Sequence, residues 1–281
     1  MRRALRGIVV ASALTVCWPA MAAAQNDLER ARTLYNAGEY EQSIQAAEAA
    51  KAKPNAVASA TLIAARARLE RFRATNDAAD LAAARASLVS LNPHELSLQE
   101  TTEWQIGLGT ALFLEHQPGP AADMFETAIP SARERLSAAE FDKLLEWWAS
   151  AASRVAEGFN AKARKDAYAR MYAAIREELA RNPLSRPAIY WSVVALRGLG
   201  DLDGAWNAAI AGWIRAGAQA TQFRAELERF VLQTLIPERA QSRTGQRLGS
   251  KVTIGEIASL SEVWRETIGR WAPESPSAKN D

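Results

Sequence analysis

The sequence predicts an all-α fold built from antiparallel helix pairs. Apolar residues recur at the three- and four-residue spacing of an amphipathic helix along most of the chain. Short breaks that contain Gly or Pro divide this pattern into consecutive segments, as tight turns between helices do. Gly occurs only 15 times and Pro 11 times in 281 residues, which leaves room for long helices. This length is enough for one large or two small domains with a buried core.

The first predicted pair begins near Asp27. One helical stripe of apolar residues ends at the break 36–38, which contains Gly38, and a second runs from Tyr40 to Ala50, before Pro54. A second pair is expected over 62–72 and 81–91, closed by Pro93.

A third pair begins after a capping box formed by Ser97 and Glu100. Its first helix contains Trp104 and Leu112, the break lies at 116–120, and the second helix is expected to end at Pro130.

The stretch "LGDLDGAW", residues 199–206, is predicted to be a turn between two further helices. Gly200 suits a left-handed helix cap because it has no Cβ, and Asp201 can accept hydrogen bonds from the next helix's free N–H groups. Capping explains these carboxylates better than a metal or phosphate loop does.

The remaining segments are also predicted to be helical. Ser137 and Glu140 form another capping box, and a long helix ends at Asn182. A helix over 221–235 is expected to end before Pro237, and 239–251 is expected to be a loop or a frayed helix. The last helix is expected to cap the stack with the apolar residues Val263, Trp264, Ile268 and Trp271.

The helix pairs resemble tetratricopeptide repeats, whose pattern combines small, Gly and aromatic positions. The matching residues are Ala31, Gly38, Tyr40, Ser43 and Ala50 in the first copy, Leu108, Gly109, Leu112, Ala121, Phe125 and Ala128 in the third, and Leu196, Gly200, Leu202 and Ala205 in the last. The resemblance covers about half of the chain after its first 24 residues. It implies a superhelical α-solenoid over 25–236, a loop and C-terminal capping helix over 237–271, and a disordered tail over 272–281.

The same resemblance implies a concave groove lined by the first helix of each pair. Carried over by position, the groove residues are Arg32, Tyr35 and Asn36 in the first copy, Thr110 and Phe113 in the third, and Tyr190 and Arg197 in the last. Arg and aromatic residues suit recognition of a peptide or protein. Leu28 stands where some family members have a Lys that binds peptide C-termini, which argues against that specificity. Charge reversal at Arg32 or Arg197 is expected to weaken partner binding without unfolding the protein.

The N-terminus has the features of an export signal. Arg2, Arg3 and Arg6 precede an apolar run over 8–18 that is too short to span a bilayer, and alanines at 22–24 suit cleavage. We expect a signal peptide over 1–24 that is cut after Ala24, with Ala22 as the second choice, and a periplasmic location. An uncleaved anchor is the alternative. Lipidation at Cys17 is disfavoured because Val16 is too bulky for that signal.

Cleavage would change the chemistry of the chain. The only Cys would be lost, which excludes disulfides and thiol catalysis in the processed chain. Loss of three of the 34 basic residues would leave one more acidic than basic residue, because the 32 acidic residues all remain. This balance gives no reason to expect nucleic acid or an anionic membrane as a partner.

No catalytic or cofactor motif is evident in the sequence. The two histidines, His94 and His116, fall in predicted turns without a carboxylate cluster at metal-ligand spacing. Nucleophile elbows and Gly-rich phosphate loops are not found. We therefore expect no enzyme, no metal and no cofactor.

The expected function is that of a non-catalytic scaffold or adaptor in the bacterial cell envelope, which binds a protein or peptide in its concave groove. The alternative is an accessory protein that binds a small ligand or a saccharide inside the helical bundle, for example in substrate uptake. The Trp and Tyr content motivates this alternative: eight of the nine Trp residues and all five Tyr residues would remain after cleavage. Self-association and the identity of the partner stay open.

Overall fold

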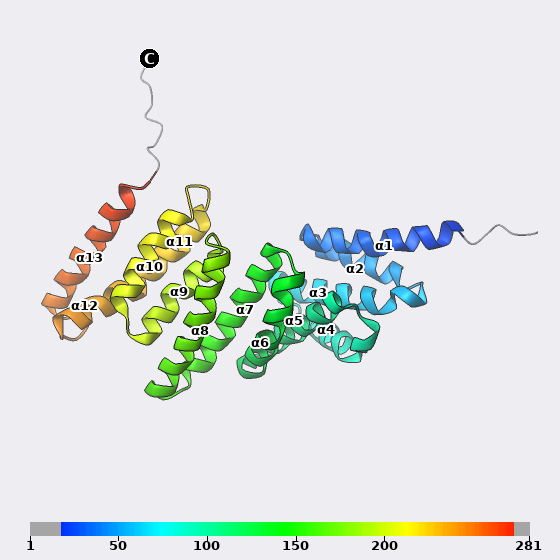
Figure 1. Ribbon diagram of the computed structural model, residues 1–281, viewed down its shortest axis with the longest axis horizontal. Coiled ribbons are helices and arrows are strands. Elements are labelled where there is room, and N and C mark those ends of the chain that lie inside the picture. Colours follow the sequence, from blue (N-terminus) through cyan, green and yellow to red (C-terminus); the bar gives the residue numbers. More distant parts are fainter. Residues whose placement is uncertain (1–17, 273–281) are drawn as a thin grey trace, which may run out of the picture. The chain divides into compact units, whose positions relative to one another are not determined.

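The computed structural model describes residues 18–272 and the side chains from residue 27 on. Residues 1–17 of the expected signal peptide 1–24 and residues 273–281 of the expected tail 272–281 lie outside the described residues. The described chain is all-α, without strands, and its helices pack mainly against their neighbours in sequence (Figure 1). It divides into two compact units, with the boundary between Ala111 and Leu112.

The first unit contains two helix pairs and most of a fifth helix, which crosses the boundary. The helices are α1 (Trp18–Asn36), α2 (Tyr40–Ala50), α3 (Val57–Thr75), α4 (Ala78–Ser90) and α5 (Leu98–Leu114), with short 3₁₀ turns at Pro54–Ala56 and Pro93–Glu95. A core of mainly alanines joins α1, α2 and α3. These small side chains allow close helix packing, and the buried Ser43 hydroxyl donates to the Ala31 carbonyl at 2.8 Å.

The second unit continues the pattern of antiparallel neighbours. Its helices are α6 (Pro118–Arg135), α7 (Ala138–Glu157), α8 (Ala161–Arg181), α9 (Arg186–Leu199), α10 (Leu202–Arg215), α11 (Thr221–Phe230), α12 (Ile236–Thr244) and α13 (Lys251–Gly269), and a π-helical segment, Val231–Leu235, joins α11 to α12. Helix α9 packs against α8 and α10, and it also contacts α7. The first helices of two successive pairs, α7 and α9, therefore lie against each other.

The turn chemistry predicted from the sequence is confirmed at several helix ends. Gly200 adopts φ +82°, and the Asp201 side chain accepts a hydrogen bond from the Gly204 N–H at 2.8 Å. The expected capping boxes form at Ser97 and at Ser137, each with the Glu three residues later. Gly38 adopts φ +80° in the turn between α1 and α2.

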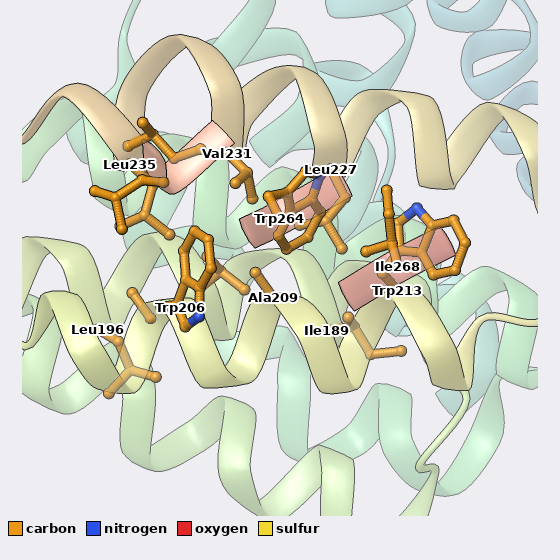
Figure 2. Close-up of a cluster of buried hydrophobic side chains, with 14 of the residues drawn as sticks. Ile189, Leu196, Trp206, Ala209, Trp213, Leu227, Val231, Leu235, Trp264 and Ile268 are labelled. Carbon is orange, nitrogen blue, oxygen red and sulfur yellow. The ribbon is translucent and has the colours of Figure 1, made fainter. Parts of the chain in front are cut away.

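A large aromatic and aliphatic core holds α9 to α13 together. Figure 2 shows Trp206 and Trp264 facing each other within it, in an edge-to-face arrangement with ring centroids 5.6 Å apart. Helix α13 contributes Leu260, Trp264 and Ile268 to this core. Val263 is 45% exposed and Trp271 is 62% exposed, so the expectation that these two residues help the last helix to pack is wrong.

Two prolines do not end helices as the sequence predicts. Pro130 lies inside α6 on its exposed side, where water can bind the carbonyl that loses its N–H partner. Pro237 follows the π-helical segment, where the Ile236 N–H donates to the Val231 carbonyl, and the change of hydrogen-bond pattern accommodates the proline. Residues 239–244, expected to be a loop or a frayed helix, are helical in α12.

The close approach of α8 and α9 yields a first stability prediction. A Cβ atom at Gly198 would overlap the ring of Tyr168, which is buried and hydrogen-bonded to Ser153 at 3.0 Å. We expect Gly198→Ala to lower the free energy of unfolding by about 1–3 kcal/mol, despite the better helix propensity of Ala. Chemical denaturation followed by circular dichroism measures this change.

Gly255 provides the matched control, because it lies in helix α13 and no atom comes within 4 Å of an added Cβ. Gly255→Ala should raise the free energy of unfolding by about 0.5–1 kcal/mol. Equal stability changes in the two variants would contradict the close packing at Gly198.

Candidate functional site

The second unit contains an open cleft with a volume of about 800 Å³. It is bounded by α7, α9, α11 and the π-helical segment. The lining residues are Glu146, Ser150, Arg186, Pro187, Tyr190, Trp191, Gln222, Phe223, Glu226, Arg229, Phe230, Gln233 and Thr234. Helices α7, α9 and α11 are the first helices of successive pairs, so the cleft occupies the face on which a repeat groove is expected.

Local hydrogen bonds fix the start of α9 beside α7. Ser185 caps α9 by accepting from the Ala188 N–H, and its hydroxyl donates to Asp142 Oδ1 on α7 at 2.5 Å. Burial raises the pKa of the Asp142 carboxyl, whereas the Ser185 hydrogen bond and Arg186 lower it. Pro187 then starts the helix, because its missing N–H is not needed in the first turn.

Aromatic side chains form the centre of the cleft wall. The Tyr190 ring lies edge-to-face with Trp191 at 5.6 Å between ring centroids, and with Phe230 at 5.5 Å. Trp191 is buried, and its indole Nε1–H donates to Glu146 Oε2 at 2.8 Å. Contacts on two sides hold the Tyr190 ring, which links α9 to the end of α11.

Charged groups of both signs surround this aromatic centre. Burial raises the pKa of Tyr190, and the carboxylates of Glu146 and Glu226 raise it further, while Arg197 opposes them. Arg186 and Arg229 line the same cleft but do not contribute to this shift. The cleft lining thus combines the carboxylates of Glu146 and Glu226 with the guanidinium groups of Arg186 and Arg229.

The π-helical segment shapes one wall of the cleft. Phe230 precedes it, and Gln233 and Thr234 lie within it. A π-helical turn inserts an extra residue and rotates the side chains that follow, and such turns are frequent at functional sites. Pro237, at which the sequence predicts that a helix ends, comes three residues after Thr234 of the cleft wall.

Of the residues predicted to line a groove in this unit, the structure places one in the cleft wall, namely Tyr190. The Arg197 guanidinium instead donates two hydrogen bonds to the Glu238 carboxylate, one from Nε at 2.7 Å and one from Nη2. Phe113 is buried, with its ring 5.1 Å from that of Trp147 and with Arg154 4.3 Å above it. Arg197 and Phe113 are therefore engaged within the unit.

The other predicted groove residues lie in the first unit. Arg32 pairs with Glu100 at 2.5 Å, and Tyr35 has the Arg66 guanidinium 4.6 Å from its ring centroid. Burial raises the pKa of Tyr35 to about 12. The side chain of Asn36 is exposed at the end of α1. Thr110 is buried, and its hydroxyl donates to the Ile106 carbonyl at 2.9 Å.

These pairings change how the groove should be tested. Arg32 and Arg197 each hold a carboxylate on another helix, so charge reversal would place two like charges together and disturb the packing. Charge-reversal variants at Arg32 and Arg197 are therefore expected to destabilise the fold as well as to change the groove. Exposed cleft residues such as Gln222 and Gln233 are better probes.

The sequence reading missed most of the cleft residues. A signal was present, because Glu146 and Ser150, Arg186 and Tyr190, and Gln222 and Glu226 are each separated by four residues on the first helices. These pairs mark a polar and aromatic face beside the apolar stripe. The apolar stripes alone are enough to identify the helices, but they do not indicate these polar faces.

A second hollow of about 350 Å³ lies among α6, α7 and α8. Small side chains form much of its wall, together with Trp148, Phe159, Met171 and three charged residues. Its lining lacks the paired aromatic rings of the larger cleft.

Within residues 18–272, no helix is long and apolar enough to cross a membrane. The same part of the chain has no group of three or more His, Cys, Asp or Glu residues that could hold a metal ion. Comparison with protein-family models, with curated proteins and with solved structures finds no match to this chain. The cleft must therefore be interpreted from its own chemistry.

Proposed function

We propose that this protein is an exported, non-catalytic scaffold of the cell envelope that binds an extended peptide segment of another protein. The binding site is the cleft between α7, α9 and α11. The observation that carries the proposal is this open cleft of about 800 Å³, with aromatic rings at its centre and charged groups around them. Its volume lies within the range typical of ligand sites.

The composition of the cleft supports a protein partner. Aromatic residues and Arg are enriched at protein interfaces, where they provide most of the binding energy. Tyr190, Trp191 and Phe230 provide rigid apolar surface, and the exposed Gln222 and Gln233 provide amide groups that can bond to a peptide backbone.

The repeat resemblance supports the same site. In a tetratricopeptide-type solenoid the first helices line the concave binding face. In this chain α7, α9 and α11 are first helices, and α7 and α9 are in contact. The basic and apolar N-terminal sequence supports export to the periplasm.

A small ligand or saccharide is the second candidate function, and the rings of Tyr190 and Trp191 favour it. Large side chains such as Trp206, Trp213 and Trp264 fill the core between α9 and α13. A small ligand with this function would therefore use the open cleft and not the interior of this core.

The test fills the cleft from its exposed rim. A Gln222→Trp/Gln233→Trp variant places two indole rings in the cleft, while Gln241→Trp adds one at an exposed position of α12 outside it. The wild type and both variants are immobilised and exposed to an envelope extract, and quantitative mass spectrometry identifies what each retains. We expect the wild type and Gln241→Trp to enrich the same protein, and the cleft-filled variant to retain at least tenfold less.

Equal capture by all three proteins, with equal melting curves, would contradict a cleft-binding scaffold. Capture of no protein, together with a change in Trp fluorescence on addition of cell-wall saccharides that the cleft-filled variant lacks, would establish the second candidate instead.

A further inference from the structure

We propose that the hollow among α6, α7 and α8 is a second binding site, which takes one free amino acid with a large apolar side chain. The ammonium group of this ligand binds the carboxylates of Asp123 and Glu126, and its carboxylate binds the Arg170 guanidinium. The hollow and the cleft of α7, α9 and α11 have no lining residue in common. The amino acid is therefore a ligand additional to the peptide proposed for the cleft.

The shape of the hollow suits a small molecule. One face of each helix lines it: Gly119, Ala122, Asp123 and Glu126 on α6, Trp148, Ala152 and Val155 on α7 with Phe159 just after its end, and Ala167, Arg170, Met171 and Ala174 on α8. Five of these residues are Gly or Ala, and they leave about 350 Å³ between the larger side chains. This volume lies within the range of small-molecule sites and is less than half that of the cleft.

The charged residues of the hollow are divided by sign between two helices. Asp123 and Glu126 are three residues apart on α6, so they are neighbours on one face and can share the three donors of an ammonium group. Arg170 lies on α8, and a guanidinium binds a carboxylate through two parallel hydrogen bonds.

These charged groups are available to a ligand. Within residues 27–272, no ion pair or side-chain hydrogen bond engages the carboxylates of Asp123 and Glu126 or the guanidinium of Arg170. All three residues are exposed, so they lie at the mouth of the hollow. A ligand with a single charge would pair with only one of the two helices.

The remaining lining is apolar and contains a polar group without a partner. Met171 and Trp148 are almost fully buried, whereas Val155 and Phe159 are partly exposed. The Trp148 indole Nε1–H is buried and finds no acceptor among the described residues. A buried donor of this kind is costly to leave unpaired, so an acceptor oxygen on a ligand would be favoured beside it.

A free amino acid matches each of these features. Its ammonium and carboxylate groups are attached to one carbon atom, so they can bind α6 and α8 at the mouth of the hollow. A large apolar side chain then covers the apolar residues, which removes their surface from water. The same groups within a peptide chain are amides, which carry neither charge.

The test is isothermal titration calorimetry on the purified full-length protein with L-phenylalanine, L-leucine, L-methionine and L-alanine. We expect at least one of the three large amino acids to bind, with one molecule per chain. L-Alanine should bind roughly tenfold more weakly or less, because it leaves the apolar residues uncovered. Failure of all three large amino acids to bind at millimolar concentration would overturn the inference.

Analogues of the ligand test the two charged contacts separately. For L-phenylalanine they are 2-phenylethylamine, which lacks the carboxylate, and 3-phenylpropionate, which lacks the ammonium group; the corresponding analogues are used for leucine or methionine. Each should bind roughly tenfold more weakly than the amino acid, because each loses one set of charged hydrogen bonds. Equal affinity of the amino acid and both analogues would overturn the zwitterion selectivity.

Variants assign each contact to its helix. Arg170→Gln should weaken binding of the amino acid roughly tenfold and leave the amine analogue unaffected, and Asp123→Asn/Glu126→Gln should spare the carboxylate analogue in the same way. Lys165→Gln removes a positive charge from an exposed residue of α8 outside the hollow and should change nothing. Equal effects of Arg170→Gln and Lys165→Gln would overturn the assignment.

A filled hollow locates the ligand. Ala174→Trp places an indole ring in the hollow and should abolish binding, whereas Ala173→Trp adds one at the exposed neighbouring position and should not. Gln222→Trp/Gln233→Trp, which fills the cleft, should leave amino-acid binding unchanged, so failure of the proposed function does not affect this result. Unchanged binding by Ala174→Trp with an unchanged melting curve, or loss of binding in the cleft-filled variant, would overturn the inference.

Discussion

Replacement of Trp264 by alanine should lower the free energy of unfolding by about 3–5 kcal/mol, the range found for large aromatic residues removed from protein cores. Trp264 is fully buried, and its ring packs against Trp206 at the centre of the core that joins α9 to α13 (Figure 2). The cavity left by the indole would be too deep for neighbouring helices to fill. Urea denaturation followed by circular dichroism measures the loss.

Trp271→Ala is the matched control, because it removes the same side chain just after the end of α13. Trp271 is 62% exposed, so its removal should change the free energy of unfolding by less than about 0.5 kcal/mol. Similar losses in the two variants would contradict the assignment of Trp264, and not Trp271, as the residue that holds the last helix.

Replacement of Arg66 by methionine should also destabilise the protein, by about 3–5 kcal/mol, because it leaves a buried carboxylate without its cation. The Glu103 side chain is only 2% exposed and binds the Arg66 guanidinium at 2.6 Å. Arg66 also covers the Tyr35 ring, so its loss removes packing as well as charge. Chemical denaturation of the purified variant measures the change.

The double variant Arg66→Met/Glu103→Leu separates these effects. Removal of both charges eliminates the uncompensated carboxylate, so most of the lost stability should return. A double variant as unstable as the single one would show that packing over Tyr35, and not the buried charge, accounts for the loss.

The ion pairs of the first unit indicate why the second unit is the better candidate for binding. On α1, α3 and α5, Arg32 pairs with Glu100 and Arg66 pairs with Glu103. These contacts join α1 and α3 to α5, and each Arg is paired with a carboxylate of α5. In the second unit, α7, α9 and α11 leave an open cleft at the corresponding helices.

Much of the fold can be predicted from local sequence chemistry. Gly200 needs a positive φ, Asp201 caps the next helix, and Ser137 forms a capping box with Glu140, and the structure confirms all three. Local signals of this kind depend on only a few neighbouring residues. Helix period and turn residues therefore predict the succession of helix pairs.

The errors arise where tertiary contacts decide the outcome. Pro237 is compatible with a continuing helix because the preceding π-helical turn changes the hydrogen-bond pattern. Trp264 and Trp271 both fit the apolar pattern of α13, but only Trp264 meets the core. The spacing of apolar residues identifies the apolar face of a helix. It does not show how far along that face the neighbouring helices extend, and so which of its residues are buried.

The candidate site was predicted only in part for the same reason. Tyr190 lines the cleft, as predicted for a groove residue on the first helix of a pair. Arg197, two turns later on α9, instead forms an ion pair with Glu238 of α12. That pairing joins residues 41 positions apart, and Glu238 lies in α12, next to the segment 239–251 for which the sequence predicts a loop or a frayed helix. Glu226 was missed because isolated carboxylates on amphipathic helices are usually solvated.

The central claim, that the cleft of α7, α9 and α11 binds a peptide segment of another protein, is tested most directly by site-specific photo-crosslinking in the native host. A benzophenone amino acid replaces Gln233 in the cleft wall, and in a second strain Gln241, which is exposed on α12 outside the cleft. We predict one discrete crosslinked partner from position 233, lost when Gln222→Trp is added, and none from position 241. Crosslinking of the same partner from position 241 alone, or equally from both positions, would contradict the account.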